Sequence, residues 1–169
     1  MKTNLLIISL IVIPMSCNLY SENDDKQALS VDVGITLSVT DSAGNDLLDS
    51  TQAGAIDISK IKRYYLDENG KKIEFYHSYL ESPRGIVFYP KDEFQKINLL
   101  AFWIDDTNEH STTLIEWNEA RTDTITADII RLDMLIYADN IQYNGVAVKD
   151  TLQAVYDRTG YRYYPIVWE

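Results

Sequence analysis

The clearest pattern of apolar and polar positions is a strict alternation close to the start of the chain. Between Val31 and Thr40, each aliphatic residue is followed by a small or polar one. Successive side chains of a β-strand point to opposite faces, so the alternation puts every aliphatic side chain on one face. We predict a strand here, with the face that contains Ile35 in the core and the face that contains Thr36 in solvent.

An Asn-Gly pair at 69–70 predicts a β-hairpin. It separates two runs rich in apolar residues, 61–66 and 73–77. Asn and Gly both tolerate a positive φ, which makes this pair the strongest short-range hairpin signal. A two-residue loop would pair Leu66 with Ile73. A longer loop with a bulge is the alternative, and it would shift the register by one residue.

A second Asn-Gly pair, at 144–145, predicts a second hairpin. The segments on either side of it are short and carry apolar residues in alternation. A two-residue loop pairs Tyr143 with Val146 and Ile141 with Val148.

Short apolar runs separated by turn residues continue along the rest of the chain. The run 97–104 is almost entirely apolar, which is typical of a strand that is covered on both faces. Pro165 places the last strand at a sheet edge, because proline cannot donate a hydrogen bond to a neighbouring strand. The segment 151–157 is ambiguous between a loop and a helical turn. The other predicted strands are 86–89, 112–117, 124–130, 134–137 and 161–168.

Many short strands without a long helix predict an all-β fold. We expect residues 31–169 to form a single domain, an antiparallel β-sandwich of the immunoglobulin-like type or a similar one. A sizeable core is possible, because 46% of the residues are hydrophobic. The chain has a single cysteine, so no intramolecular disulfide can stabilise this fold.

Residues 1–16 have the composition of an export signal. A basic residue is followed by the apolar run 5–13, and Ser16 directly precedes Cys17. The run is shorter than the roughly 18 apolar residues that a membrane-spanning helix needs. The position of the cysteine resembles the lipobox of bacterial lipoproteins, although Pro14 stands where leucine is usual. The alternatives are an ordinary signal peptide with an incidental cysteine and an uncleaved membrane helix.

The lipobox resemblance implies that 1–16 is a lipoprotein signal peptide and that Cys17 is acylated, which would anchor the protein in the outer membrane. The segment 17–30 is polar and acidic, so we expect a flexible, solvated tether. Acidic residues after a lipidated cysteine resemble the surface-export signal of Bacteroidetes lipoproteins, and a plain acidic linker is the alternative. The sequence leaves open whether the domain faces the periplasm or the cell surface.

Several turn and strand segments resemble those of Bacteroidetes cell-envelope lipoproteins. The resemblance spans most of the chain after the signal segment. It implies an envelope location and a β-rich fold, and it carries no activity or catalytic residue. The segments are 41–48, 112–118, 123–125 and 143–145.

The formal net charge of −11 limits the choice of partners. An acidic protein repels the phosphates of nucleic acids, so no nucleic-acid partner is expected. The same charge is compatible with neutral glycans, cations or basic proteins. The sequence contains no glycine-rich phosphate-binding loop, and no cofactor is expected.

The two histidines, His77 and His110, are the candidates for acid–base chemistry. The sequence contains neither a Gly-x-Ser-x-Gly motif nor a histidine pair with metal-ligand spacing. The leading hypothesis is a membrane-anchored, non-catalytic binding or accessory module with a glycan or protein ligand. The alternative is an envelope hydrolase that cleaves glycosides or esters with scattered carboxylates and one histidine.

One polar loop offers several oxygen atoms to a cation such as Ca²⁺. Its side chains do not follow the spacing of a helix–loop–helix calcium site, which includes a glycine and a terminal glutamate. We therefore expect a solvated loop and no metal site. The residues concerned are Asp105, Asp106, Asn108 and Glu109.

Aromatic residues are abundant, with twelve Tyr and three Trp. Tyr and Trp combine a flat apolar face with a polar tip, which suits stacking on a sugar ring. Trp117, Tyr164 and Trp168 lie on predicted strands and are the candidates for such a stacking surface. The alternative is that they belong to the core, because aromatic residues are also favoured in strands.

Overall fold

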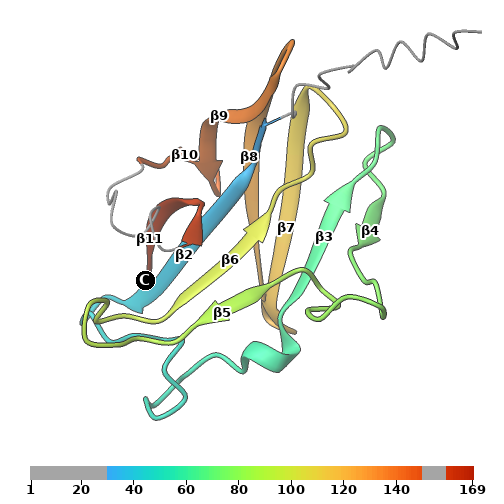
Figure 1. The fold of residues 1–169 in the computed structure, drawn as a ribbon. Helices are drawn as coiled ribbons and strands as arrows, with labels where there is room; N and C mark the ends of the chain where they lie inside the picture. Colours follow the sequence, from blue (N-terminus) through green and yellow to red (C-terminus); the bar gives the residue numbers. More distant parts are fainter. Residues whose placement is uncertain (1–29, 150–158) are drawn as a thin grey trace, which may run out of the picture.

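Two β-sheets packed face to face make up the fold (Figure 1). The structure is a computed structural model that describes residues 30–149 and 159–169. The prediction of an all-β sandwich is confirmed. The signal segment 1–16, Cys17 and the tether up to residue 29 lie outside the described residues, as does the ambiguous segment 151–157.

The larger sheet has seven strands and the smaller one four in the described part of the chain. The larger sheet contains β1 (Ser30–Asp32), β3 (Lys62–Leu66), β4 (Lys72–Glu74), β7 (His110–Asn118), β8 (Arg121–Leu132), β9 (Leu135–Tyr143) and β10 (Val146–Ala147). The smaller sheet contains β2 (Gly34–Asp41), β5 (Val87–Tyr89), β6 (Leu99–Trp103) and β11 (Arg162–Trp168), and a 3₁₀ turn, η1 (Ile58–Lys60), precedes β3. The strand orders are β1–β9–β8–β7–β3–β4, with β10 paired to β9, and β11–β2–β6–β5.

The main core fills the space between the two sheets. Ile35 and Leu37 of β2 face Ile115 and Ile125 of the larger sheet in this core, and each of the four is about 1% exposed. Burial of an aliphatic side chain of this size contributes about 1.5–3 kcal/mol. The alternation in the sequence therefore identified the core face of β2 correctly.

The other face of β2 was predicted to be in solvent, and this prediction is wrong. Thr36 is fully buried, and its hydroxyl donates to that of Thr159 at 3.1 Å. The Tyr163 hydroxyl lies 2.8 Å from the Ser38 hydroxyl, so a tyrosine of β11 covers this face. Small polar residues here are buried under aromatic side chains.

Two strand pairs run parallel within an otherwise antiparallel sandwich. β1 pairs with β9, and β11 pairs with β2 from Arg162 opposite Ile35 to Trp168 opposite Asp41. The predicted edge position of the last strand is confirmed, because β11 ends the order of the smaller sheet. Its proline, Pro165, is exposed at that edge.

The first predicted hairpin exists, but its loop is longer than two residues. Leu66 pairs with Lys72 and Tyr65 with Ile73, so the two-residue register that placed Leu66 opposite Ile73 is wrong. The Asp67 carboxylate accepts hydrogen bonds from the backbone N–H groups of Asn69 and Lys71, which holds a wider turn. The register is shifted by one residue, as in the alternative of a longer loop.

The second predicted hairpin is confirmed with its register. Val146 pairs with Tyr143, and the backbone N–H of Val148 donates to the carbonyl of Ile141. Asn144 and Gly145 both have positive φ, 50° and 78°, as a two-residue loop of this type requires.

The apolar run 97–104 contains β6, which is buried on both faces from Leu99 to Phe102 as predicted, whereas Trp103 at its end is 48% exposed. Leu100 and Phe102 belong to the main core, while Leu99 packs with Tyr163 in a small second cluster on the opposite face. In the described residues, no helix is long and apolar enough to cross a membrane.

Candidate functional site

Two of the three predicted stacking residues are core residues. Trp117 is 1% exposed and Tyr164 is 3% exposed. Their rings face the inside of the sandwich, so neither presents a face to a ligand. The predicted stacking surface of Trp117, Tyr164 and Trp168 is therefore wrong.

Trp168 is partly buried at the end of β11. Its ring meets that of Trp117 edge-on, with 5.5 Å between the ring centroids. The guanidinium carbon of Arg121 lies 4.0 Å above the Trp168 ring, a cation–π contact. Trp168 closes the end of the core beneath an arginine.

A buried carboxylate explains why Trp117 lies inside the sandwich. Asp123 is 4% exposed, and its carboxylate accepts hydrogen bonds from Trp117 Nε1 at 2.8 Å and Arg121 Nε at 3.0 Å. Tyr143 and Asn144 also donate to it. Burial acts to raise the pKa of Asp123, but the hydrogen bonds from Tyr143, Asn144 and Arg121 outweigh it and hold the pKa below its usual value.

Several oxygen atoms of the candidate metal-binding loop accept hydrogen bonds from the protein itself. The Asp105 carboxylate accepts hydrogen bonds from the backbone N–H and the hydroxyl of Thr107. The carbonyls of Asp106 and Asn108 accept from Arg131. Within residues 30–149 and 159–169, no group of three His, Cys, Asp or Glu side chains is placed to hold a metal ion.

The two histidines lie in different environments. His77 packs edge-on against Phe75, with 4.7 Å between ring centroids. His110 Nδ1 lies 2.8 Å from Asp128 on the exposed surface of β7 and β8. A carboxylate in this position orients an imidazole, as in a hydrolytic triad, but no hydroxyl or thiol hydrogen-bonds to His110 in the described part of the chain.

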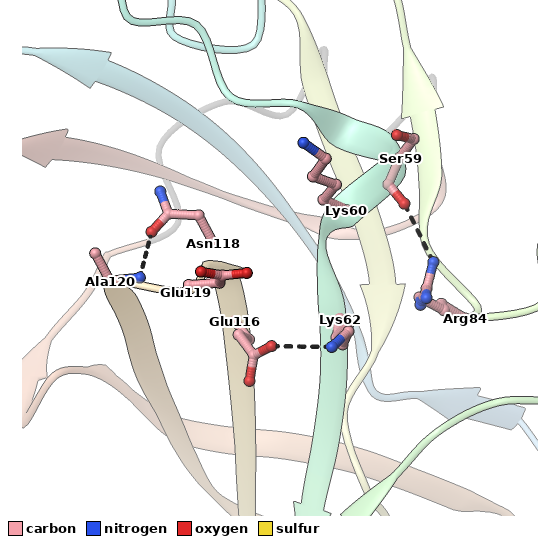
Figure 2. Close-up of a pocket in the computed structure, with 8 residues that line it drawn as sticks. All are labelled: Ser59, Lys60, Lys62, Arg84, Glu116, Asn118, Glu119 and Ala120. Carbon is pink, nitrogen blue, oxygen red and sulfur yellow. Dashed lines mark hydrogen bonds and ion pairs between the residues drawn. The ribbon is translucent and has the colours of Figure 1, made fainter.

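An open pocket lies at one end of the larger sheet (Figure 2). It has a volume of about 700 Å³, and we call it the η1–β7 pocket. One wall comes from η1, β3 and the loop before β5, and the opposite wall comes from the turn between β7 and β8. Its lining residues are Ser59, Lys60, Lys62, Arg84, Glu116, Asn118, Glu119 and Ala120.

Glu116 is the central charged group of the η1–β7 pocket. Strands β3 and β7 pair Lys62 directly with Glu116, and the Lys62 ammonium lies 3.3 Å from its carboxylate. Lys72, one strand further along, lies 3.0 Å from the other carboxylate oxygen. The two lysines, Lys72 most strongly, hold the pKa of Glu116 below its usual value against the effect of burial.

Arg84 joins this pocket to a neighbouring aromatic side chain. It donates to the carbonyl of Ser59 at 3.2 Å and lies 3.6 Å from the Glu74 carboxylate. Its guanidinium carbon is 5.9 Å from the centre of the Tyr76 ring, which is 54% exposed. An exposed aromatic ring therefore stands beside the polar pocket.

Positive and negative groups balance around this pocket, although the chain as a whole carries a net charge of −11. Four cations lie in or next to it, and each is paired with a carboxylate at 3.0 to 3.6 Å. The pairs are Lys60 with Asp57, Lys62 and Lys72 with Glu116, and Arg84 with Glu74.

No signal in the sequence points to the η1–β7 pocket. Its charged residues come from η1, β3, the loop before β5 and β7, which are distant in the chain. Only the pairing of β3 with β7 and the course of the 75–86 loop bring them together. An ion pair between residues on neighbouring strands leaves no signature in composition or in sequence spacing.

Lowering the pH should reduce the stability that the ion pairs of Glu116 give to the fold. A carboxyl group whose pKa is depressed in the folded chain stabilises the fold above its unfolded-state pKa, and this contribution is lost as the pH falls through the folded-state pKa. We expect Glu116→Gln to lower the Tm by about 2–4 °C at neutral pH and by less near about pH 3. Thermal unfolding followed by circular dichroism at both pH values measures this.

Glu119→Gln is the matched control, because Glu119 lines the same pocket from an exposed turn. It should leave the Tm unchanged at both pH values. An equal loss for Glu116→Gln at low and neutral pH would contradict an ionic role for Glu116.

Comparisons with known proteins identify no relative of this chain. No family model, no curated protein and no solved structure matches it.

Proposed function

We propose that this protein is an outer-membrane lipoprotein whose β-sandwich is a non-catalytic binding module. The η1–β7 pocket carries the proposal. It is an open pocket of about 700 Å³ lined by both hydrogen-bond donors and acceptors, which is the usual character of a small-ligand site. The anchor is supported by the signal-like segment 1–16 and the lone Cys17 that follows it.

The electrostatics of the pocket favour binding over hydrolysis. A general acid for glycoside cleavage needs a raised pKa, and a general base works best with a pKa near the operating pH. Lys62 and Lys72 shift the pKa of Glu116 in the opposite direction, so this carboxylate stays charged. A carboxylate that is charged at neutral pH is a good hydrogen-bond acceptor and a poor general acid.

The anchor is tested by removing the cysteine. Each buried CH₂ of an acyl chain contributes about 0.8 kcal/mol, so two or more chains hold a soluble domain on a membrane. The wild-type protein, expressed with its own signal segment in a Gram-negative bacterium, should incorporate labelled palmitate and sediment with membranes. Cys17→Ser should abolish the label and release the protein into the soluble fraction.

Ser21→Ala, in the same tether, is the control and should keep both the label and the membrane location. Equal labelling of Cys17→Ser would exclude acylation at this residue. The non-catalytic part of the proposal fails if the purified protein turns over fluorogenic glycosides or esters and His110→Ala or Glu116→Gln abolishes that turnover.

A further inference from the structure

We infer that the η1–β7 pocket, together with Tyr76, binds an uncharged glycan. This inference rests on the proposed binding function and names its ligand class. It is carried by three features of the described residues, namely an exposed aromatic ring at the pocket, planar polar side chains inside it, and a local balance of charge.

The aromatic ring is Tyr76, two residues after the end of β4. It is 54% exposed and adjoins Arg84, which lines the pocket. A sugar ring has an apolar face of C–H groups and a polar rim of hydroxyls. A half-exposed tyrosine matches it with a flat apolar face and a hydroxyl at its tip.

The polar groups suit hydroxyl ligands because they include donors and acceptors close together. A hydroxyl both donates and accepts, so neighbouring sugar hydroxyls bind best where carboxylate, amide and guanidinium groups alternate. Glu116, Asn118 and Arg84 supply these three groups around one pocket, and Lys60 and Lys62 add ammonium donors (Figure 2). Asn118 is held in place because its Oδ1 accepts the backbone N–H of Ala120 at 2.9 Å.

The charge distribution selects an uncharged ligand. Each of the four cations around the pocket has a carboxylate partner, so an anionic ligand would have to displace Asp57, Glu116 or Glu74. The rest of an acidic surface would also repel an anion. A neutral polyol can hydrogen-bond to these side chains without breaking their ion pairs.

The loop that carries Tyr76 and Arg84 is fixed at its base. The backbone N–H of Phe75 donates to the carbonyl of Arg63 at 2.9 Å, and that of His77 donates to the carbonyl of Pro83 at 2.8 Å. The buried Arg63 guanidinium stacks 4.0 Å from the centre of the Phe75 ring and donates to the carbonyl of Gly85. A pre-ordered loop loses little conformational entropy when a ligand binds.

Binding to a printed array of oligosaccharides tests the inference. The array carries neutral glycans, uronic-acid and sialylated glycans, and sulfated glycans, and the probe is the full acylated protein purified from membranes in detergent. We expect binding to neutral glycans only. Tyr76→Ala should weaken the affinity for the best neutral glycan at least about tenfold, which corresponds to the loss of one aromatic stacking contact.

Tyr79→Ala is the matched control. Tyr79 lies in the same loop and is 80% exposed, but its ring packs against His77, whereas the Tyr76 ring lies beside Arg84 of the pocket. The Tyr79→Ala variant should bind neutral glycans with the affinity of the wild type. The thermal stability of both variants should equal that of the wild type, because both rings are largely in solvent.

Three results would overturn the inference. They are binding to charged glycans only, no binding to any glycan on the array, and equal affinity of Tyr76→Ala and the wild type for the best neutral glycan. None of them affects the palmitate result at Cys17. If the array is silent and Glu116→Lys abolishes cross-linking to an envelope protein at this pocket, the binding module stands and its ligand is a protein.

Discussion

Replacing Asp123 with alanine should destabilise the sandwich by about 3–5 kcal/mol. The substitution removes the shared acceptor of four donors, on Trp117, Arg121, Tyr143 and Asn144. An unsatisfied buried donor costs about 1–3 kcal/mol, and loss of the carboxylate also leaves the Arg121 guanidinium without its ion-pair partner. Urea denaturation followed by tryptophan fluorescence measures the effect, because Trp117 donates directly to the carboxylate.

Asp128→Asn is the control for this substitution. Asp128 pairs with His110, whose side chain is 82% exposed, so this variant should unfold at nearly the same urea concentration as the wild type. Similar losses for Asp123→Ala and Asp128→Asn would mean that the buried network does not hold the sandwich together.

A charge on either face of β2 should prevent stable folding. Ile35 is 1% exposed and Thr36 is fully buried, so Ile35→Asp and Thr36→Asp each place an unpaired carboxylate out of water. We expect each to cost at least about 3 kcal/mol, which is a large part of the 5–15 kcal/mol of a typical domain. The melting temperature of each purified variant, or its recovery in inclusion bodies, reports the loss.

Thr40→Asp supplies the comparison on the same strand. Thr40 is only partly buried near the end of β2, so this variant should melt close to the wild type. A mild Thr36→Asp together with a severe Ile35→Asp would show that the outer face of β2 is open to water.

The strands could be predicted from the sequence because periodicity and turn residues act locally. The alternation in β2 and the positive φ of Asn144 and Gly145 are properties of a few neighbouring residues. The same local signals were less reliable at 69–70, where the Asp67 carboxylate holds a wider turn. They also split β9 into two predicted strands, although it runs unbroken from Leu135 to Tyr143 through Asn140, which has a φ of 48°.

Burial could not be predicted in the same way. Alternation tells which side chains share a face, and it says nothing of what covers that face. The alternation assigns Thr36 to a solvent-facing side of β2. In the structure this side is covered, because Tyr163 of the neighbouring strand β11 lies against it and contacts the Ser38 hydroxyl. Trp117 was a stacking candidate because it lies on a predicted strand, and nothing in the sequence links it to its hydrogen-bond partner Asp123.

The candidate site was the least predictable part. Glu116 meets Lys62 across a strand pair, and it meets Lys72 through a third strand. Tyr76 lies beside the pocket because Arg84, which lines it, is 5.9 Å from the Tyr76 ring. These contacts depend on register, and register at the Asn69-Gly70 hairpin is where the sequence prediction was off by one residue.

The pairing of β11 with β2 also sets the order in which the protein can fold. A ribosome delivers the N-terminus first, so β2 emerges early, and of the described strands its parallel partner β11 emerges last. Contacts between residues 123 to 126 positions apart close late, because a long loop must be ordered before they form. Until β11 has emerged, the edge of β2 that pairs with it is open to other chains. The small sheet is therefore completed only after β11 has left the ribosome, and a chain truncated before β11 should aggregate.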